Sequence, residues 1–349
     1  MTSPQHQLKE PDDGARAVLE VDDLQVTFSK GGGKVHAVNG ISYTAFAGQT
    51  LAIIGESGSG KSVSVRALMG LLPDTAFVSG SAKIEGKELV GISPREMRQV
   101  RGSEIAMVFQ DPARSLNPTM TIGAQITEAV RTHKPVTKKA SKTRVIELLK
   151  LVKMPAAERR FHEYPHQLSG GMRQRAMIAI ALASDPKVLI ADEATTALDV
   201  TTQAQIMELL LDLQEKLGTA VILISHDLGL AASYADHVFV MYAGKIVEYA
   251  PAAQLFHNVR MPYTDALLGA IPKLSDPPHT ELTVIGGHPP DLSELPQGCS
   301  FAARCPRVTE QCRQITPVLR SEEPGHEFAC HNPVPSRDAV AATAEGAET

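Results

Sequence analysis

The run Gly55-Glu56-Ser57-Gly58-Ser59-Gly60-Lys61-Ser62 decides the fold of this chain. It matches the pattern G-x-x-x-x-G-K-[ST], in which glycines let successive backbone N–H groups point at phosphate oxygens. A short β-rich stretch, residues 50–54, precedes the run. We expect a helix to begin near Lys61, so that the positive end of the helix dipole faces the phosphates. The Lys61 ammonium would bring a full positive charge next to the β- and γ-phosphates, and the Ser62 hydroxyl would bind Mg²⁺. The sequence therefore predicts a nucleoside triphosphate site between a strand and a helix.

Polar side chains follow two further apolar runs. Residues 188–191 and 221–224 have the continuous hydrophobic character of parallel strands that are buried on both faces. Asp192 and Glu193 follow the first run and His226 follows the second, so all three would lie at the edge where open α/β sheets bind ligands. We expect Asp192 to hold Mg²⁺, Glu193 to orient and deprotonate the attacking water, and His226 to reach the γ-phosphate. The alternatives are a solvated acidic turn and a structural histidine.

Hydrophobic periodicity predicts several other elements. Residues 203–217 form an amphipathic helix that ends at Gly218 and links the two apolar strands as a βαβ unit. Residues 238–241 and 245–248 form a hairpin. A second amphipathic helix covers residues 141–153. The inward positions of the two helices are Ile206, Leu209, Leu210, Leu213 and Leu217, and Val145, Leu148, Leu149 and Val152.

Length and composition limit the class of protein. The chain has 349 residues, which corresponds to about two domains, and a hydrophobic content of 43%, enough for a packed core. Its net charge of −5 argues against a nucleic-acid partner. No run approaches the roughly 18 to 20 apolar residues that cross a bilayer, and residues 1–15 lack the apolar stretch of a secretory signal. We therefore expect a cytoplasmic protein whose membrane role, if any, comes through a partner.

A second run, Leu168-Ser169-Gly170-Gly171-Met172-Arg173-Gln174-Arg175, is similar to the signature of ATP-binding cassette (ABC) proteins. This run, the phosphate-binding loop at 55–62 and the carboxylates of Asp192 and Glu193 occur in one chain. On these features residues 18–257 resemble an ABC ATPase. The matches are residues 55–62 with Walker A, 188–193 with Walker B, 197–199 with the D-loop, Gln110 with the Q-loop, His226 with the switch histidine and Phe28 with the adenine-stacking aromatic.

This resemblance implies an α/β fold: a RecA-like P-loop core with an antiparallel β subdomain and a helical subdomain at about 112–170. It implies two cassettes that face head to tail, with ATP between the Walker A loop of one and the signature of the other. Glu193, His226 and Gln110 would be catalytic, and Ser62, Gln110 and Asp192 would hold Mg²⁺. The expected ATP contacts are Phe28, Gly55, Glu56, Ser57, Gly58, Ser59, Gly60, Lys61, Ser62, Ser169, Gly170, Gly171 and Asp199.

A narrower resemblance links the chain to the ATP-binding subunits of bacterial di- and oligopeptide importers and related nickel importers. It rests on residues 110–118, 191–201, 261–272 and 298–312, and within that group the tail is similar to the permease "D" subunit. It implies peptide uptake, a distinct second ATPase subunit, two membrane permease subunits, an external binding protein and a place on the cytoplasmic face of the membrane. Alternatives are a nickel or other small-solute importer, a soluble ABC ATPase, and a non-catalytic cassette that would lack Glu193 or His226. Ala194, Met172 and Met261 depart from the usual patterns.

All four cysteines lie in the expected C-terminal extension, residues 258–334, in which a Pro-rich tract, residues 262–296, leads into the cysteine region. The spacing Cys299-x5-Cys305-x6-Cys312-x17-Cys330 does not fit the usual zinc fingerprint, whereas four thiolates can hold an iron–sulfur cluster. Resemblance to the permease "D" subunits implies a [4Fe–4S] cluster here. The alternatives are zinc, adventitious thiols without a metal, and a redox-sensitive disulfide. Residues 1–17 and 335–349 are expected to be flexible tails.

Overall fold

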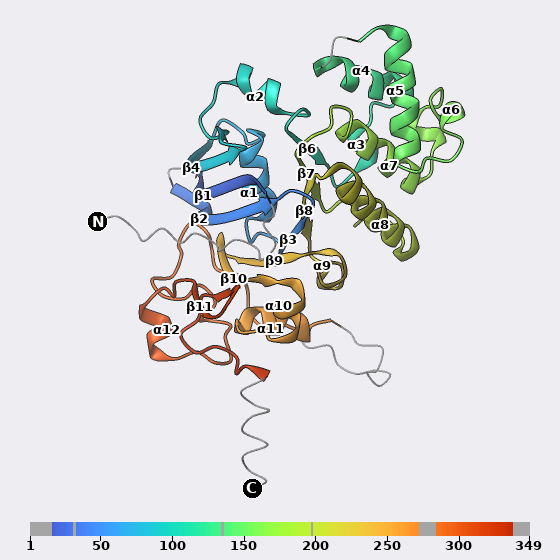
Figure 1. Ribbon diagram of the computed structural model, residues 1–349. Coiled ribbons are helices and arrows are strands. Elements are labelled where there is room, and N and C mark those ends of the chain that lie inside the picture. The colour runs from blue at the N-terminus through green and yellow to red at the C-terminus, as the bar shows by residue number, and fades with distance from the viewer. Residues whose placement is uncertain (1–15, 31–32, 134–135, 197, 272–283, 338–349) are drawn as a thin grey trace.

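The computed structural model describes residues 16–30, 33–133, 136–196, 198–271 and 284–337, and its strands form two sheets (Figure 1). The first sheet is antiparallel, in the order β2-β1-β4-β5, and the second has eight strands in the order β11-β12-β10-β9-β3-β8-β7-β6. The strands of the antiparallel sheet are β1 (Ala17–Lys30), β2 (Gly33–Phe46), β4 (Ala76–Ile84) and β5 (Lys87–Glu88). Those of the larger sheet are β3 (Thr50–Ile54), β6 (Ile105–Val108), β7 (Val188–Asp192), β8 (Ala220–Ser225), β9 (His237–Tyr242), β10 (Lys245–Pro251), β11 (Arg320–Glu323) and β12 (His326–Phe328).

The parallel strands that the apolar runs predict are present. β6, β7, β8, β3 and β9 pair in parallel, and β9 and β10 form the predicted antiparallel hairpin. The expected C-terminal extension is joined to this sheet, because β12 pairs with β10 and β11 pairs with β12 at its edge. The β1 strand also begins at Ala17, inside the predicted N-terminal tail.

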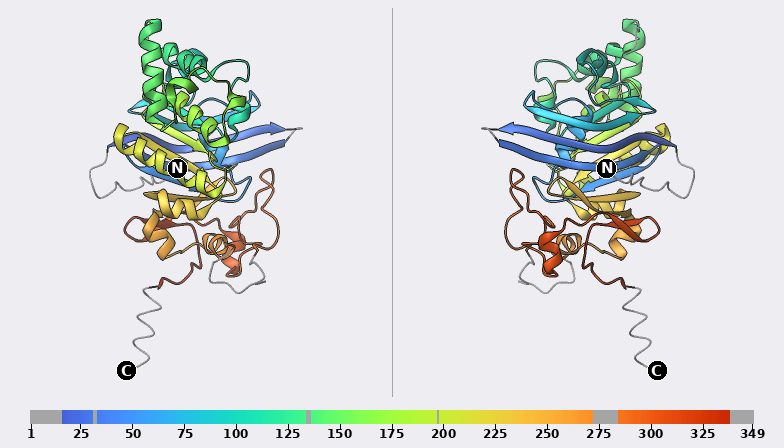
Figure 2. Two further views of the ribbon diagram at one scale, coloured as in Figure 1. Left: turned by 90° about the vertical axis from the view of Figure 1, so that its right-hand side faces the viewer. Right: turned by 90° about the vertical axis from the view of Figure 1, so that its left-hand side faces the viewer.

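Side chains of β7 alternate between two hydrophobic layers. Val188 and Ile190 pack with the antiparallel sheet and helix α1 (Lys61–Leu68), whereas Leu189 and Ala191 pack with the helical group on the opposite face. Both faces of the strand are therefore buried, which explains its continuous apolar sequence. Figure 2 shows the helical group at one end of the molecule, the extension at the other and the sheets between them.

The helical group covers most of the predicted subdomain. It contains α3 (Pro112–Ser115), α4 (Ile122–His133), α5 (Lys138–Leu151), α6 (Ala157–Arg160) and α7 (Gly170–Ala181), and α2 (Pro94–Val100) precedes it in the chain. The predicted inward residues of α5, Val145, Leu148 and Leu149, together with Val152 just past its end, are fully buried. The helix begins three residues earlier than predicted because the Thr137 side chain accepts from the Ala140 N–H and caps it.

Helix α8 (Val200–Leu217) links β7 to β8, as predicted, but begins earlier because Asp199 caps it. It ends at Gly218, whose φ of +63° is left-handed. The prediction that Leu217 faces inward is wrong, since 38% of that residue is exposed in the last turn. In the described residues, no helix has the length and apolar character needed to cross a membrane.

The C-terminal extension packs on the remaining part of the sheet. Helices α9 (Leu228–Tyr234), α10 (Ala252–His257), α11 (Pro262–Gly269) and α12 (Glu310–Gln314) lie in this region. Tyr263, Phe301 and Phe328 are buried with strand residues such as Val238 and Val240, so the extension shares a core with the cassette.

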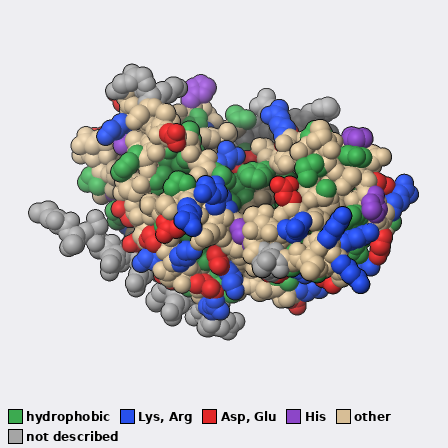
Figure 3. Space-filling model, turned by 90° about the horizontal axis from the view of Figure 1, so that it is seen from above, with side chains coloured by type: hydrophobic (Ala, Val, Ile, Leu, Met, Phe, Trp, Pro, Cys, Tyr) green, Lys and Arg blue, Asp and Glu red, His purple; other side chains and the backbone are tan. Residues whose placement is uncertain are grey.

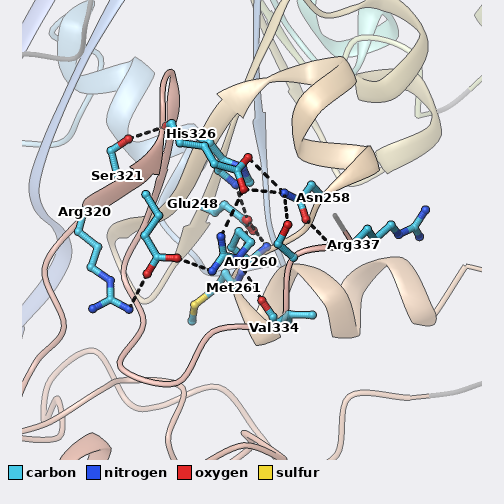
Figure 4. Close-up of polar contacts among 12 residues, drawn as sticks. Glu248, Asn258, Arg260, Met261, Arg320, Ser321, His326, Val334 and Arg337 are labelled. Atoms are coloured by element: carbon cyan, nitrogen blue, oxygen red, sulfur yellow. Dashed lines mark hydrogen bonds and ion pairs between the residues drawn. The ribbon is translucent and has the colours of Figure 1, made fainter. Parts of the chain in front are cut away.

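A buried polar cluster fixes the extension to β10 (Figure 4). Glu248 and His326 are both fully buried, and their side chains meet at 2.9 Å between Oε1 and Nε2. The same carboxylate oxygen accepts from the N–H groups of Arg260 (2.7 Å) and Met261 (3.2 Å). Of the predicted tail 335–349 only residues 335–337 are described, and there the Arg337 N–H donates to the Asn258 Oδ1 at 3.1 Å. The rest of that tail, and residues 1–15 of the other, lie outside the described residues.

Candidate active site

The phosphate-binding loop joins β3 to α1. Gly60 has a φ of +104°, and a Cβ at this position would lie 2.4 Å from the Ala37 carbonyl oxygen, so only glycine fits. Gly60 caps α1 without a side-chain hydrogen bond, which leaves the first N–H groups of the helix to face a ligand. The Ser59 hydroxyl in the loop is buried and has no hydrogen-bond partner among the described residues. A buried, unpaired donor beside a helix start is what an anion-binding loop requires.

Lys61 is folded over this loop. The residue is only 6% exposed, and its Nζ donates to the carbonyl oxygens of Gly55 (2.6 Å) and Glu56 (2.9 Å). Burial lowers the pKa of Lys61, and the nearby carboxylates of Glu193, Asp192 and Glu56 counteract that shift. Lys61 is therefore the cation at the centre of an acidic site.

Ser62 and Asp192, two of the three ligands predicted for Mg²⁺, are in direct contact. The Ser62 Oγ donates to the Asp192 Oδ1 at 2.7 Å, and Asp192 is buried at the end of β7. Mg²⁺ prefers a small number of hard protein oxygens and completes its shell with water and phosphate oxygens, so this pair fits the ion. Arg66 on α1, which the sequence did not single out, donates to the Asp192 Oδ2 at 3.1 Å and fixes the carboxylate.

Glu193, Gln110 and His226 also converge, from the ends of β7, β6 and β8. The Gln110 Nε2 donates to the Glu193 Oε2 at 2.6 Å, and the His226 Nδ1 lies 3.8 Å from the Glu193 Oε1. Glu193 has a φ of +49°, a strained value for this residue type, and 23% of its side chain is exposed. A carboxylate held between an amide and an imidazole, and open to solvent, can accept a proton from a water molecule. Gln110 contacts Glu193 here, and its predicted role as a Mg²⁺ ligand stays a prediction.

The signature residues lie apart from this group. Ser169 caps α7 by accepting from the Met172 N–H at 3.4 Å. Helix α7 packs in the helical layer, whereas α1 packs in the layer on the opposite face of the sheet. Gly171 approaches α8 so closely that a Cβ would lie 2.7 Å from the Thr202 Cγ2. Gly171 therefore has a packing role within the chain, whereas a Cβ at Gly170 would make only an ordinary contact, 3.5 Å from the Leu198 Cδ2.

Two predicted ATP contacts have structural roles in this chain. Phe28 on β1 is half-buried and packs against the core under the antiparallel sheet. Asp199 caps α8, where its carboxylate accepts from the Thr202 N–H (2.9 Å) and from the Thr202 hydroxyl (2.7 Å), and these bonds lower the pKa of Asp199. Ala197 of the predicted D-loop lies outside the described residues. The contacts of Phe28 and Asp199 with ATP stay predictions.

The four cysteines lie in one region of the extension as free thiols. Burial raises the pKa of Cys330 to about 11, and the thiols of Cys299, Cys305 and Cys312 are near enough to add to that shift. Nevertheless, in the part of the chain that the structure describes, no three His, Cys, Asp or Glu side chains are arranged to hold a metal ion. As arranged here, the thiols do not fit an iron–sulfur cluster.

The extension also contacts the phosphate-binding loop, through residues that no sequence motif indicates. The Arg304 guanidinium pairs with the Glu56 carboxylate, and the Tyr263 hydroxyl accepts from the Glu56 N–H at 2.8 Å. These partners are 248 and 207 residues from Glu56 in the sequence, so no local pattern could have revealed them.

Known families match both parts of the chain. The model of the ABC transporter family matches residues 38–196, and that of the "Oligopeptide/dipeptide transporter, C-terminal region" matches residues 247–312. The chain is 53% identical over 289 residues to the oligopeptide transport ATP-binding protein OppD of Bacillus subtilis, covering 82% of this chain and 81% of that protein. It is 48% identical over 320 residues to OppD of Salmonella typhimurium, covering 92% and 95% of the two chains.

Solved structures give a similar result for the cassette. The dimeric structure of the ATP-binding cassette MJ0796 in a post-hydrolysis state, bound to ADP and Pi, superposes with a TM-score of 0.60 at 27% identity. The match covers 67% of this chain and 98% of that one.

Proposed function

We propose that this chain is the ATP-hydrolysing subunit of a peptide importer. The chain belongs to the ABC transporter family and to its oligopeptide and dipeptide group. The observation that carries the proposal is the meeting of Ser62 with Asp192, and of Glu193 with Gln110, at the carboxyl ends of parallel strands beside a phosphate-binding loop. A non-catalytic cassette is disfavoured, since both Glu193 and His226 are present at that edge.

Each group of residues has a distinct part in hydrolysis. The loop N–H groups and Lys61 bind the triphosphate, and Ser62 and Asp192 would hold Mg²⁺, which would supply positive charge beside the phosphates. Glu193 accepts the proton of the attacking water. Gln110 keeps the Glu193 carboxylate in place through its 2.6 Å hydrogen bond, and His226 borders the same carboxylate.

The signature run supports an arrangement of two subunits. Helices α7 and α1 pack on opposite faces of one sheet, so a second cassette in the reverse orientation could bring its own Ser169, Gly170 and Gly171 to this loop. The same arrangement would bring Asp199 and the adenine platform at Phe28 to the shared nucleotide. The relative described as dimeric, and bound to ADP and Pi, supports this proposal. We further propose that the second subunit is a distinct paralogue.

Transport requires partners in the membrane. The relatives are named oligopeptide and dipeptide transport ATP-binding proteins, which supports uptake of such peptides through two permease subunits and an external binding protein. The chain would then sit at the cytoplasmic face of the membrane. Gln110 and the helical group at 112–170 would transmit closure of the cassettes to the permeases, because Gln110 lies between the catalytic glutamate and that group.

Co-purification and uptake test the proposal. The chain, expressed with its neighbouring genes, should purify with two membrane subunits and a second ATPase, and the complex should hydrolyse ATP faster with binding protein and peptide. Stimulation by nickel instead would support the small-solute importer. Hydrolysis by the chain alone, with no membrane partner recovered, would contradict the transport role.

The [4Fe–4S] cluster stays a prediction from the cysteines and the family resemblance. The gathering of four thiols supports it, the arrangement of the described residues does not, and no step of the mechanism depends on it. Anaerobically purified protein would contain about four iron atoms per chain and be brown if the cluster is present. Colourless, iron-free protein would rule out the cluster.

A further inference from the structure

Glu56 brings a negative charge into the loop that is to bind a triphosphate. It is the second residue of the motif, and its carboxylate acts on Lys61, whose pKa it helps to keep from falling. The Glu56 side chain is 25% exposed, so solvent screens its charge only in part. Without a compensating cation, this carboxylate would repel the phosphates that Lys61 attracts.

Arg304 from the C-terminal extension compensates for that charge. Its Nη1 lies 2.6 Å from the Glu56 Oε2 and its Nη2 lies 2.8 Å from the Glu56 Oε1, which is a two-pronged ion pair. Only 4% of the Arg304 side chain is exposed. Because Arg304 is buried and the contact is bidentate, this ion pair should be stronger than an ordinary surface salt bridge.

All five N–H donors of Arg304 are used. Besides the two bonds to Glu56, the Nε donates to the Gly286 carbonyl (2.9 Å), the Nη2 to the Ile285 carbonyl (3.2 Å) and the Nη1 to the Tyr242 hydroxyl (3.2 Å). The hydrogen bond to Glu56 is the main cause that raises the pKa of Arg304. The guanidinium is therefore held in one orientation by the extension and by β9, and it presents a fixed fork to the loop.

Tyr263 holds the backbone of the same loop residue. Its hydroxyl accepts from the Glu56 N–H at 2.8 Å, and its fully buried ring lies 4.5 Å from that of Tyr242 and 5.3 Å from that of Phe301, between centroids. The extension also borders the outer side of the loop, where Pro289 and Pro290 line a small cavity with residues 56–59. The loop is thus held on two sides by residues beyond position 257.

The extension can act as a fixed support because it is itself anchored. The buried pair of Glu248 and His326 joins β10 to β12, and the N–H groups of Arg260 and Met261 bind the same carboxylate (Figure 4). Arg304 therefore reaches the loop from a unit that is built into the sheet.

We propose that Arg304 is a positioning residue of the nucleotide site, supplied by the C-terminal extension, which cancels the charge of Glu56 and holds the phosphate-binding loop. It makes the affinity for a triphosphate depend on the extension. This inference rests on the proposed function, because it assumes that the loop binds ATP.

The test compares how the wild type and the Arg304→Met variant, both as the full chain, bind three ligands of decreasing negative charge. Binding of ATP, ADP and adenosine is measured with a displaced fluorescent ATP analogue. Removal of the cationic charge that compensates for Glu56 should weaken ATP binding by about tenfold or more. The loss should be smaller for ADP and absent for adenosine, and should shrink at high salt. A variant that merely distorts the site would lose all three ligands alike, and that result would overturn the proposal.

Two further variants complete the test. Arg304→Met combined with Glu56→Gln should recover most of the ATP affinity, because the uncompensated carboxylate is gone. Arg307→Met serves as the matched control, since Arg307 lies in the same segment and donates to Asn332. If Arg304→Met does not fold, Glu56→Gln alone decides: ATP affinity should be retained or rise, and a tenfold loss would overturn the proposal. A wild-type chain that binds no ATP would instead reject the proposed function.

Discussion

Replacement of Glu193 by glutamine should separate nucleotide binding from hydrolysis. The glutamine keeps the shape of the side chain and can still accept from the Gln110 amide, which donates to the Glu193 Oε2 at 2.6 Å. It cannot take a proton from water. General-base catalysis contributes about 10²- to 10⁴-fold, so kcat should fall by that factor, which equals roughly 3 to 5 kcal/mol in the barrier.

Affinity for ATP should move in the opposite direction. Among the carboxylates that act on Lys61, Glu193 has the largest effect, so its charge reaches the point where the phosphates bind. Removing this negative charge from the neighbourhood of the phosphates should tighten binding by up to about tenfold. The Glu193→Gln variant should therefore hold ATP and favour a closed pair of cassettes.

The assay compares phosphate release by the assembled transporter with nucleotide binding. Because the chain has no tryptophan, binding is followed with a fluorescent ATP analogue. Glu208→Gln, at an exposed position on α8, is the control and should behave as the wild type. A kcat for Glu193→Gln within twofold of the wild-type value would remove Glu193 as the catalytic base.

Three further predictions address binding, stability and pH. Lys61→Ala should lower ATP affinity by at least about 100-fold while the circular dichroism spectrum stays unchanged, and retained affinity would count against the loop as the binding site. Leu148→Ala, in the helical group, should cost about 2 to 5 kcal/mol in urea unfolding without changing the ATP affinity of the folded protein; an unchanged midpoint would contradict its burial. Burial lowers the pKa of His237, so the unfolded chain takes up the proton first as the pH falls below about 6.5, and stability is lost from there downward. His237→Phe should show a smaller loss of stability between pH 7.5 and 5.5 than the wild type, and an equal loss would refute this reasoning.

Elements with a continuous or periodic apolar sequence could be predicted closely. The β3 strand has the bounds that its sequence indicates, and the β9–β10 hairpin and the fully buried residues of α5 lie where they were expected. Helix starts were less predictable, since α8 begins at its cap, Asp199, well before the first buried apolar residue, Ile206. The apolar pattern reports burial, whereas the first turn of a helix is fixed by hydrogen bonds of its cap.

The residues of the nucleotide site likewise include some that the sequence indicates and others that it does not. Ser62, Asp192, Glu193, Gln110 and His226 could be found because each follows a strand or a glycine motif, and parallel strands bring their carboxyl ends to one edge. Arg66 carries no such signal, although it lies one helical turn beyond Ser62 and binds the same carboxylate. Strands β11 and β12 are only four and three residues long, too short for a periodic signal, and they were missed for that reason.

The contact between Arg304 and Glu56 changes what the smallest functional unit of this chain can be. A cassette that ended near residue 257 would keep every motif of the nucleotide site, yet it would leave the Glu56 carboxylate without its bidentate partner and the Glu56 N–H without the Tyr263 hydroxyl. It would also expose the strand residues that pack on Phe301 and Phe328. Because the loop and the extension share both a charge pair and a hydrophobic core, the extension is part of the fold of the ATPase. A substitution that loosens it should therefore be detected first at the nucleotide, well before it is detected at any partner.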